Sequence, residues 1–301
     1  IILLTQANAL EKHLPFDTAR YAYIGEYIEV AKALGFEHVN PDRALHYMHY
    51  HRAYKTEYEL TCMREANRIA IGAHKAAELA FLAGKSEFDI NLDYLAAARQ
   101  GDNQVPYNNI IALNEHSAIL HYTVLETQAP TESLSFLIDA GASVHGYASD
   151  ITRTYTTSTG VFADMIKGVD ALTVELAGKL TPQKSYIETH LQAHTGIAIL
   201  LEEFGIVNLP AQEIVAKGIT KTFFPHGIGH MLGLQVHDVA GHVHDDRGTP
   251  HPAPAEHPFL RCTRDIEANH VYTIEPGLYF IDSLLAKLKA TPESQYVNWD
   301  V

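Results

Sequence analysis

The sequence has few cysteines and no long apolar run. Its 301 residues include two cysteines, Cys62 and Cys262, which lie too far apart for a CxxC motif. No disulfide framework or thiolate metal site is therefore expected, and such sparse cysteine usage is typical of the reducing cytoplasm. No stretch approaches the roughly 18 apolar residues that a membrane-spanning helix needs, so no membrane association is expected.

Positive charge is also scarce. Lys and Arg together number 22 against 36 Asp and Glu, which gives a formal net charge of −14. A nucleic-acid backbone would be repelled by the molecule as a whole, so nucleic acid is not an expected partner. Hydrophobic residues make up 47% of the chain, enough for one large domain or for one domain with an appendage.

Both ends of the sequence resemble interior segments of a protein. The start has no initiator Met, no basic region and no long apolar region, so it is not a signal peptide. The last residues, QYVNWDV, alternate like a strand and stop without a turn or a cap. We therefore expect a sequence that is incomplete at both ends, either as part of a longer enzyme or as a truncated gene product.

The order of predicted elements indicates an α+β fold. ARYAYIGEYIEVAKALGF is a βα unit, helical spacing runs from residue 57 to 82, and Ser86 is a plausible N-cap of the next helix. Strands grouped apart from helices favour helices that cover one face of an antiparallel sheet. Strands are expected at 109–113, 118–125, 134–142, 147–155 and 270–280, and helices at 161–206 and AQEIVAKGI.

Two aspartates flank a predicted hairpin in FLIDAGASVHGYASDITRTY. If the turn is centred on Val144-His145, Asp139 lies directly opposite Asp150 on one face of the sheet. Like charges in this arrangement destabilise a sheet, and partly buried charge costs more still, so a positive group is expected between them. The alternative is a pair of exposed aspartates at strand ends.

A third carboxylate and a histidine-rich loop favour a metal site. Glu275 interrupts an apolar strand, and PHGIGHMLGLQVHD carries His226, His230 and His237 among glycines that disfavour a regular helix. No glutamate follows the first histidine, which excludes the H-E-x-x-H zinc helix. Three acids with His230 form an oxygen-rich ligand set that suits Mn²⁺, Co²⁺ or Zn²⁺.

Several motifs in the same order resemble those of the dinuclear metallopeptidases of the pita-bread fold. They are LIDAGA, ASDITRTY, PHGIGH and TIEPG. Residues 21–301 are similar to the bacterial Xaa-Pro dipeptidases (prolidases) of the organophosphorus acid anhydrolase type, especially in HYHRAYKTEYELTCMREAN, HPFLRCTR and IEPGLYFIDSLL. The resemblance implies a curved, mostly antiparallel sheet covered by helices. Residues 1–45 would be the remnant of an N-terminal domain, and 46–301 the catalytic domain without its C-terminal strands.

The resemblance also implies metal ligands and a reaction. Asp139 would bind one metal, Asp150 would bridge two, and His230 and Glu275 would bind the second. Mn²⁺ is expected, with Co²⁺ and Zn²⁺ as alternatives. Two ions about 3.5–4 Å apart would hold a hydroxide for attack on the scissile carbonyl of an Xaa-Pro dipeptide, with Glu275 as the base. The family has a fifth ligand, a second bridging glutamate C-terminal to Glu275. The acids after Glu275 are Asp282, Glu293 and Asp300. None of them lies in a motif like that of the family's fifth ligand.

Substrate-handling residues follow from the same resemblance. His226, His237 and His121 would stabilise the tetrahedral intermediate or the leaving imide nitrogen, although a hydrogen-bonded core histidine is an alternative for His121 and His226. Arg261 is a candidate clamp for the dipeptide carboxylate. Three residues are candidate pocket walls: Tyr107, Leu120 and Val236. Four further histidines are expected to be solvated loop positions: His242, His244, His251 and His257.

The resulting expectation is a cytoplasmic dipeptidase, a homodimer when full length, that releases C-terminal proline. Hydrolysis of phosphotriesters would be incidental, because their tetrahedral phosphorus resembles the peptide transition state. The alternative from another class is a non-catalytic pita-bread protein that binds a partner. Among enzymes, aminopeptidase P is the nearest rival, and acceptance of tripeptides separates the two.

Overall fold

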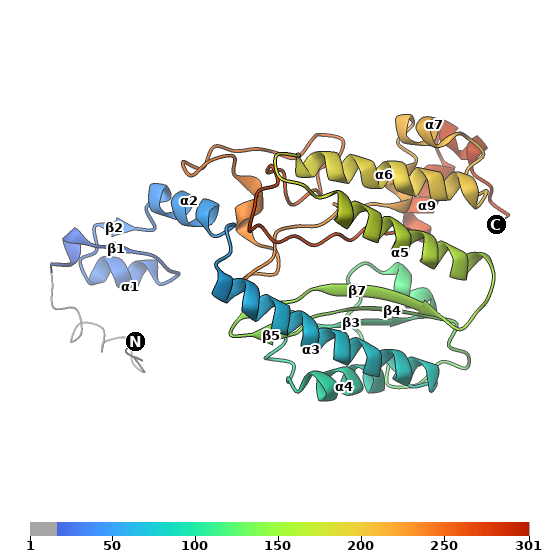
Figure 1. The fold of residues 1–301 in the computed structure, drawn as a ribbon, viewed down its shortest axis with the longest axis horizontal. Coiled ribbons are helices and arrows are strands. Elements are labelled where there is room, and N and C mark those ends of the chain that lie inside the picture. Colours follow the sequence, from blue (N-terminus) through green and yellow to red (C-terminus); the bar gives the residue numbers. More distant parts are fainter. Residues whose placement is uncertain (1–16, 301) are drawn as a thin grey trace. The chain divides into compact units, whose positions relative to one another are not determined.

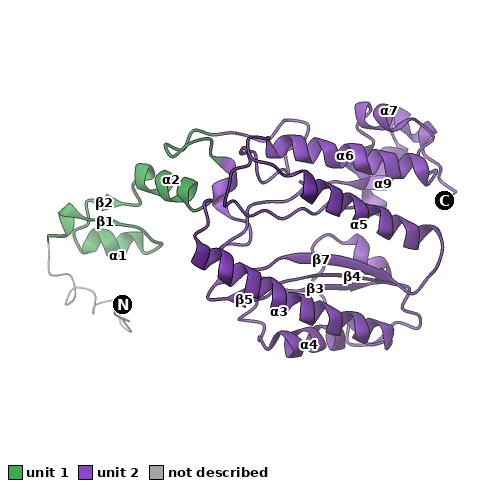
Figure 2. Ribbon diagram, in the orientation of Figure 1, with its two compact units in different colours: residues 1–52, 243–250 green, residues 53–242, 251–301 purple. Residues whose placement is uncertain are grey.

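The computed structural model describes residues 17–300 and divides into two compact units (Figures 1 and 2). One unit contains the chain up to Arg52 together with Val243–Pro250. Its short strands β1 (Ala22–Tyr23) and β2 (His38–Val39) pair in parallel around α1 (Ile28–Ala33), and α2 (Asp42–His51) follows. The expected βα unit is therefore present. The predicted domain boundary at residue 45 stays a prediction.

The second unit is built around a three-stranded antiparallel sheet. The strand order is β3 (Ile110–Leu113), β4 (Ser135–Ala140), β7 (Ile151–Thr156), and a small hairpin of β5 (Ser143–Val144) and β6 (Tyr147–Ala148) links the last two. Its helices are α3 (Glu57–Leu82), α4 (Glu87–Ala98), α5 (Val161–Lys179), α6 (Tyr186–Glu203), α7 (Ala211–Ala216), α8 (Thr220–Phe223) and α9 (Asp282–Lys289). Short 3₁₀ turns in the described chain are η3 (Thr18–Arg20), η4 (Asn114–Ala118), η5 (Val239–His242) and η6 (Pro292–Tyr296).

Helices α3 and α4 cover one face of the sheet, and α5 and α6 lie on its other side (Figure 1). Both predicted starts are capped: Thr56 forms a capping box with Glu59, and the Ser86 side chain accepts a hydrogen bond from the Asp89 backbone. Along β4, alternate residues are buried against α3 and α4. Asp139 therefore belongs to the opposite face of the sheet.

The predicted hairpin register is wrong, because the tip lies one residue further along the chain than expected. The tip is His145-Gly146, whose φ angles of 52° and 86° are those of a two-residue turn with both central residues left-handed. Asp139 consequently pairs with Thr152 and not with Asp150. Since Asp150 precedes Thr152 by two residues, the aspartates still share a face, but as diagonal neighbours.

Two other strand predictions are wrong. Residues 118–125 contain no strand, because this segment lies against α4, where the Tyr122 hydroxyl and the Glu126 amide donate to the Glu87 carboxylate. Residues 270–280 are held by backbone bonds to 228–232 but form only an isolated bridge, at Met231–Tyr272. The reciprocal bonds of a ladder are replaced at this point, because the His230 amide donates to Thr273 Oγ1 and the Thr273 carbonyl accepts from the Tyr186 hydroxyl.

A second core lies under α5 to α8 and the C-terminal segment. It includes Tyr186, Ile197, Leu201 and Phe223. Both cysteines are buried and free, as the sequence indicates. None of the helices between residues 17 and 300 combines the length and the apolar character that crossing a bilayer requires.

Glu87 joins α4 to the end of β3 and to the irregular segment after it. Its carboxylate accepts hydrogen bonds from the Leu113 and Glu126 amides and the Tyr122 hydroxyl, and His116 Nδ1 lies 2.8 Å away. Burial disfavours the charge, but these hydrogen bonds outweigh it, so the pKa of Glu87 lies below its usual value of 4.5.

We predict that Glu87→Gln lowers the free energy of unfolding by about 1.5–3 kcal/mol, because buried donors lose a charged acceptor. The stabilisation is fully present above pH 4.5 and is lost as the pH falls through the lower folded pKa. Urea titrations at neutral and acidic pH measure both effects. Glu115→Gln, at an exposed neighbouring position, is the control. A loss independent of pH would contradict this account.

Candidate metal centre

Asp139 and Asp150 are brought together by the diagonal register of β4 and β7. The Tyr107 hydroxyl lies between them, 2.7 Å from Asp139 Oδ1 and 3.0 Å from Asp150 Oδ1. The sequence predicted a positive group at this point. Of the described side chains, the one between the aspartates is a neutral phenol that can donate only one hydrogen, so the positive group stays a prediction. The repulsion between the two carboxylates is therefore only partly relieved by the protein.

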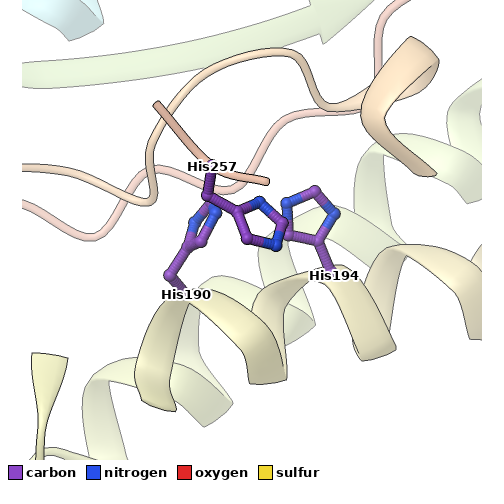
Figure 3. Close-up of side chains that lie close together, drawn as sticks. All are labelled: His190, His194 and His257. Carbon is purple, nitrogen blue, oxygen red and sulfur yellow. The ribbon is translucent and has the colours of Figure 1, made fainter. Parts of the chain in front are cut away.

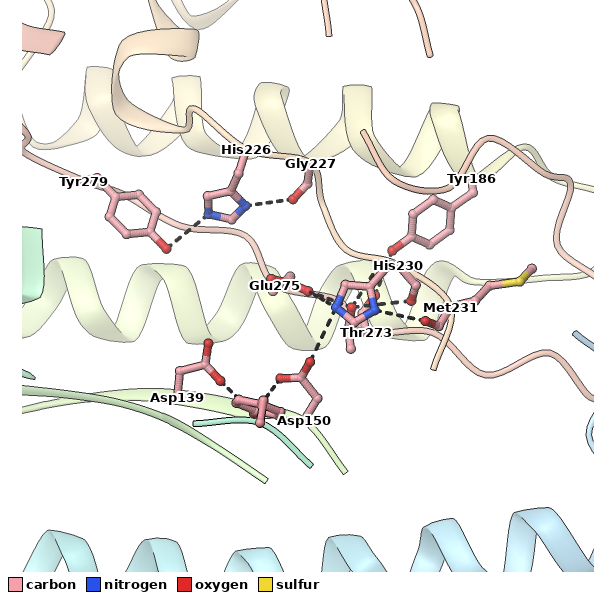
Figure 4. Close-up of polar contacts among 11 residues, drawn as sticks. Asp139, Asp150, Tyr186, His226, Gly227, His230, Met231, Thr273, Glu275 and Tyr279 are labelled. Atoms are coloured by element: carbon pink, nitrogen blue, oxygen red, sulfur yellow. Dashed lines mark hydrogen bonds and ion pairs between the residues drawn. The ribbon is translucent and has the colours of Figure 1, made fainter. Parts of the chain in front are cut away.

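His230 and Glu275 complete a cluster that draws on separate segments of the chain (Figure 4). His230 Nε2 lies 3.4 Å from Asp150 Oδ2 and 3.4 Å from Glu275 Oε1. His230 Nδ1 lies 3.0 Å from the Met231 carbonyl. A hydrogen bond donated there leaves the Nε2 lone pair directed at the carboxylates, which is the usual arrangement of a metal-binding histidine.

Close approach of two backbones orients this cluster. A Cβ at Gly229 would lie 2.4 Å from the Thr273 carbonyl oxygen, so only glycine fits there. Gly229 thereby lets the His230 loop approach the segment that carries Glu275. Thr273 donates a 2.7 Å hydrogen bond to Glu275 Oε1, and the His230 amide donates to Thr273 Oγ1.

The electrostatics of the cluster indicate a missing positive charge. Burial, followed by the negative charges of Asp150 and Glu275, raises the pKa of Asp139 to about 7. Burial likewise raises the pKa of Glu275, although 37% of its side chain stays exposed, so solvent and ions can reach it. Burial opposes protonation of His230, but its acidic neighbours raise its pKa above the usual value.

These residues fit divalent metal ions. Three carboxylates and one imidazole converge, burial and repulsion keep one carboxylate partly protonated, and the imidazole nitrogen faces the carboxylates. Such a donor set suits Mn²⁺, Co²⁺ or Zn²⁺, and a cation would replace both the proton and the repulsion.

The predicted substrate histidines lie around this cluster. The rings of His237 and His230 are 4.5 Å apart and nearly perpendicular. Burial and the neighbouring charges of His230 and Arg261 lower the pKa of His237 to about 4, so its ring is neutral near pH 7. His226 Nε2 lies 3.1 Å from the Tyr279 hydroxyl, and burial and the charge of His121 lower the pKa of His226.

The remaining predicted site residues differ in their exposure and in their contacts. Arg261 is exposed and acts electrostatically on His237 and Glu275. Tyr107, predicted to be a pocket wall, contacts the aspartates directly. Leu120 is 38% exposed, and Val236 packs against a small cluster around Met63. Pocket-wall roles for these two residues stay predictions.

Some residues of the site were missed by sequence reasoning. Thr273 and Tyr279 lie two and four residues from Glu275 in an extended segment, so alternation alone places them on its face. Tyr107 was predicted as a pocket wall, but nothing in the sequence indicates that its hydroxyl contacts both aspartates.

Among the loop histidines, His242 and His244 are exposed as expected, whereas His251 and His257 are partly buried. The expectation for His257 is wrong because its segment packs on α6, with ring centroids 4.5 and 4.6 Å from those of His190 and His194.

The sequence of residues 61–294 matches the profile of metallopeptidase family M24. The chain belongs to metallopeptidase family M24. Residues 1–50 match the N-terminal domain of Xaa-Pro dipeptidase. The predicted resemblance to prolidases of the pita-bread fold is thereby confirmed.

Proteins similar to this M24 chain include Xaa-Pro dipeptidases and aminopeptidases P. An Xaa-Pro dipeptidase of Pseudoalteromonas atlantica is 66% identical over 305 residues, which cover 100% of this chain and 69% of the relative. Solved structures of Escherichia coli aminopeptidase P, one zinc-substituted with product and one with the inhibitor Pro-Leu, are 26% identical, with TM-scores of 0.70 and 0.69. The match covers 97% of this M24 chain and 65% of each of those chains.

We predict that Tyr107→Phe weakens metal binding roughly 10–100-fold, because the hydroxyl that orients both aspartates is lost. Competition with a chelator measures the affinity. Tyr94→Phe is the matched control: it removes another buried hydroxyl, one without a hydrogen-bond partner among the described residues. Equal affinities in the two variants would show that Tyr107 does not orient the carboxylates.

Proposed function

We propose that this protein hydrolyses Xaa-Pro dipeptides with two divalent metal ions, in the cytoplasm and, when full length, as a homodimer. The convergence of Asp139, Asp150, His230 and Glu275 carries the proposal. Their separation along the chain and the partly protonated state of Asp139 support a site built for cations. Mn²⁺ is the metal we expect, and Co²⁺ and Zn²⁺ fit the same donors.

The four proposed ligands would belong to two ions. Asp139 would hold one ion, Asp150 would serve both ions, and His230 and Glu275 would hold the other. A fifth ligand, the second bridging glutamate that the resemblance implies, is not assigned to any residue of this chain. When bound, such ions supply a Lewis acid for the scissile carbonyl and lower the pKa of an attacking water.

The chain's own residues supply proton transfer and orientation. Glu275 accepts the proton of the attacking water, and the burial that raises its pKa suits this role. His237 and His226, both neutral near pH 7, donate hydrogen bonds to the developing tetrahedral centre or to the leaving imide nitrogen, together with His121.

Recognition of the dipeptide depends on a charge at one end. Arg261 pairs with the C-terminal carboxylate of the substrate, since a guanidinium binds a carboxylate through two parallel hydrogen bonds. Tyr107, Leu120 and Val236 border the positions of the side chain and the proline ring. Phosphotriester hydrolysis follows as a side activity, because tetrahedral phosphorus resembles the peptide transition state.

Two other functions compete with this proposal. Aminopeptidase P activity is favoured by the fold match to the Escherichia coli structures, whereas the 66% identical relative is named Xaa-Pro dipeptidase. A non-catalytic binding protein would not need mutually repelling acids at its centre.

Rates of hydrolysis of Gly-Pro and of an Xaa-Pro tripeptide, with added Mn²⁺, separate the dipeptidase, the aminopeptidase and the binding protein. We expect turnover of Gly-Pro alone.

We predict that Asp150→Asn abolishes binding of two metals and hydrolysis of Gly-Pro, because the bridging charge is lost. Metal content and turnover are measured on the same samples. Asp170→Asn, at an exposed position of α5, is the control. Normal hydrolysis by Asp150→Asn would refute the assignment of the bridge.

In contrast, we predict that His237→Asn keeps its metals and lowers kcat by about 10²–10³-fold, since a donor to the transition state is removed. Loss of metal in this variant would mean that His237 helps hold the ions.

A further inference from the structure

A second group of potential metal ligands lies apart from the carboxylates. His190 and His194 are four residues apart on α6 and so share one face of the helix. His257 approaches them from the loop segment 251–260 (Figure 3). One ring nitrogen from each of the three lies within 4.8 Å of the other two. Ring centroids are 4.5 to 4.7 Å apart.

Two members of this histidine cluster (His190, His194 and His257) are buried, and one of these two leaves its polar atoms without partners. His190 is 1% exposed and His194 is 3% exposed. Neither ring nitrogen of His190 has a hydrogen-bond partner among the described residues. A buried imidazole with two unpartnered nitrogens is unfavourable, because its lone pair and its N–H have both lost water. An apolar residue would fill the same space without this penalty.

The orientation of His194 is also that of a ligand. Its Nδ1 lies 2.8 Å from Thr220 Oγ1. If Nδ1 donates this hydrogen bond, Nε2 keeps a free lone pair and the ring cannot turn. Metal-binding histidines are held in this way by a second partner.

The charge state of the cluster suits a metal ion. Burial lowers the pKa values of His190 and His194 to about 3, so both rings are neutral near pH 7. Burial and Lys221 also lower the pKa of His257. Lys221 is the unfavourable neighbour of the site, and Glu256 beside His257 opposes it. Neutral imidazoles are the form that binds transition metals.

We propose that His190, His194 and His257 form a mononuclear site for a divalent transition metal ion of the Zn²⁺ type. Three imidazoles with one water give the four-coordinate geometry that Zn²⁺ prefers. Bond lengths of about 2.0–2.1 Å require nitrogens about 3.3 Å apart, so the rings need to close by about 1.5 Å at most. Phe224 separates the site from His226, with ring centroids 4.9 Å from both His194 and His226.

Such an ion would fasten the loop segment 251–260 to α6. Arg261 follows this segment directly, so the site would fix the path of the chain that leads to a candidate substrate residue. The proposal does not depend on the dipeptidase activity, because it concerns different ligands and a different kind of donor set.

The test counts zinc in variants whose carboxylate centre has lost its histidine. His230→Ala protein is dialysed against Zn²⁺ and then against a weak chelator, and zinc is measured by mass spectrometry. We expect about one zinc per chain to remain. Adding His257→Ala should weaken zinc binding at least roughly tenfold, and this partly exposed loop position limits damage to folding, which circular dichroism checks. Adding the exposed His242→Ala is the matched control and should change nothing.

Equal zinc affinity in His230→Ala and in His230→Ala/His257→Ala would overturn the proposal, as would X-ray absorption that shows fewer than three imidazole ligands. A cluster that merely holds water would give the same negative result.

Thr220→Val supplies an independent test of the orientation of His194. We expect zinc binding roughly 10–100-fold weaker, with recovery in Thr220→Ser, which restores the hydroxyl. Thr222→Val, on the same short helix, is the control. Unchanged affinity in Thr220→Val would remove His194 from the ligand set and with it the three-histidine site.

Discussion

The repulsion among carboxylates held at one point inside the protein is the constraint around which this structure is organised. Asp139 and Asp150 share a single phenol donor, and Glu275 adds a third acid beside the same histidine. Burial keeps Asp139 partly protonated near pH 7. No packing of apolar groups relieves this strain, whereas a divalent cation does so directly. The metallopeptidase function follows from that electrostatic requirement.

The two faces of the sheet have different contacts, and this difference fixes the positions of the acidic side chains. The face of β4 that packs on α3 and α4 is entirely apolar, so the strand cannot rotate or slip without burying Asp139 in that core. The opposite face is thereby free for chemistry. Gly229 then lets the His230 loop touch the backbone of the Glu275 segment, which joins two ligands through Thr273.

Two kinds of donor set occur in one catalytic unit. The carboxylate cluster is solvent-accessible and acidic, as a centre that exchanges substrate and water requires. The histidine cluster lacks acids among its three proposed ligands, and two of its three rings are buried and neutral. Their difference in burial and in donor type argues that they serve different purposes.

Motif order and local periodicity determined the family, the α+β class, the two capped helices and the metal-ligand candidates, because each depends on residues close together in the chain. The hairpin register depended on which residues could adopt left-handed angles at its tip, and His145 gave no sequence indication that it would. The predicted strands at 118–125 and 270–280 were apolar enough to form strands. Glu87 binds the first segment, and Tyr186 and the Thr273 hydroxyl take up backbone groups that would complete a ladder in the second. Tyr107 between the aspartates and His257 against α6 were decided only by tertiary structure, since each contact joins side chains far apart in the sequence.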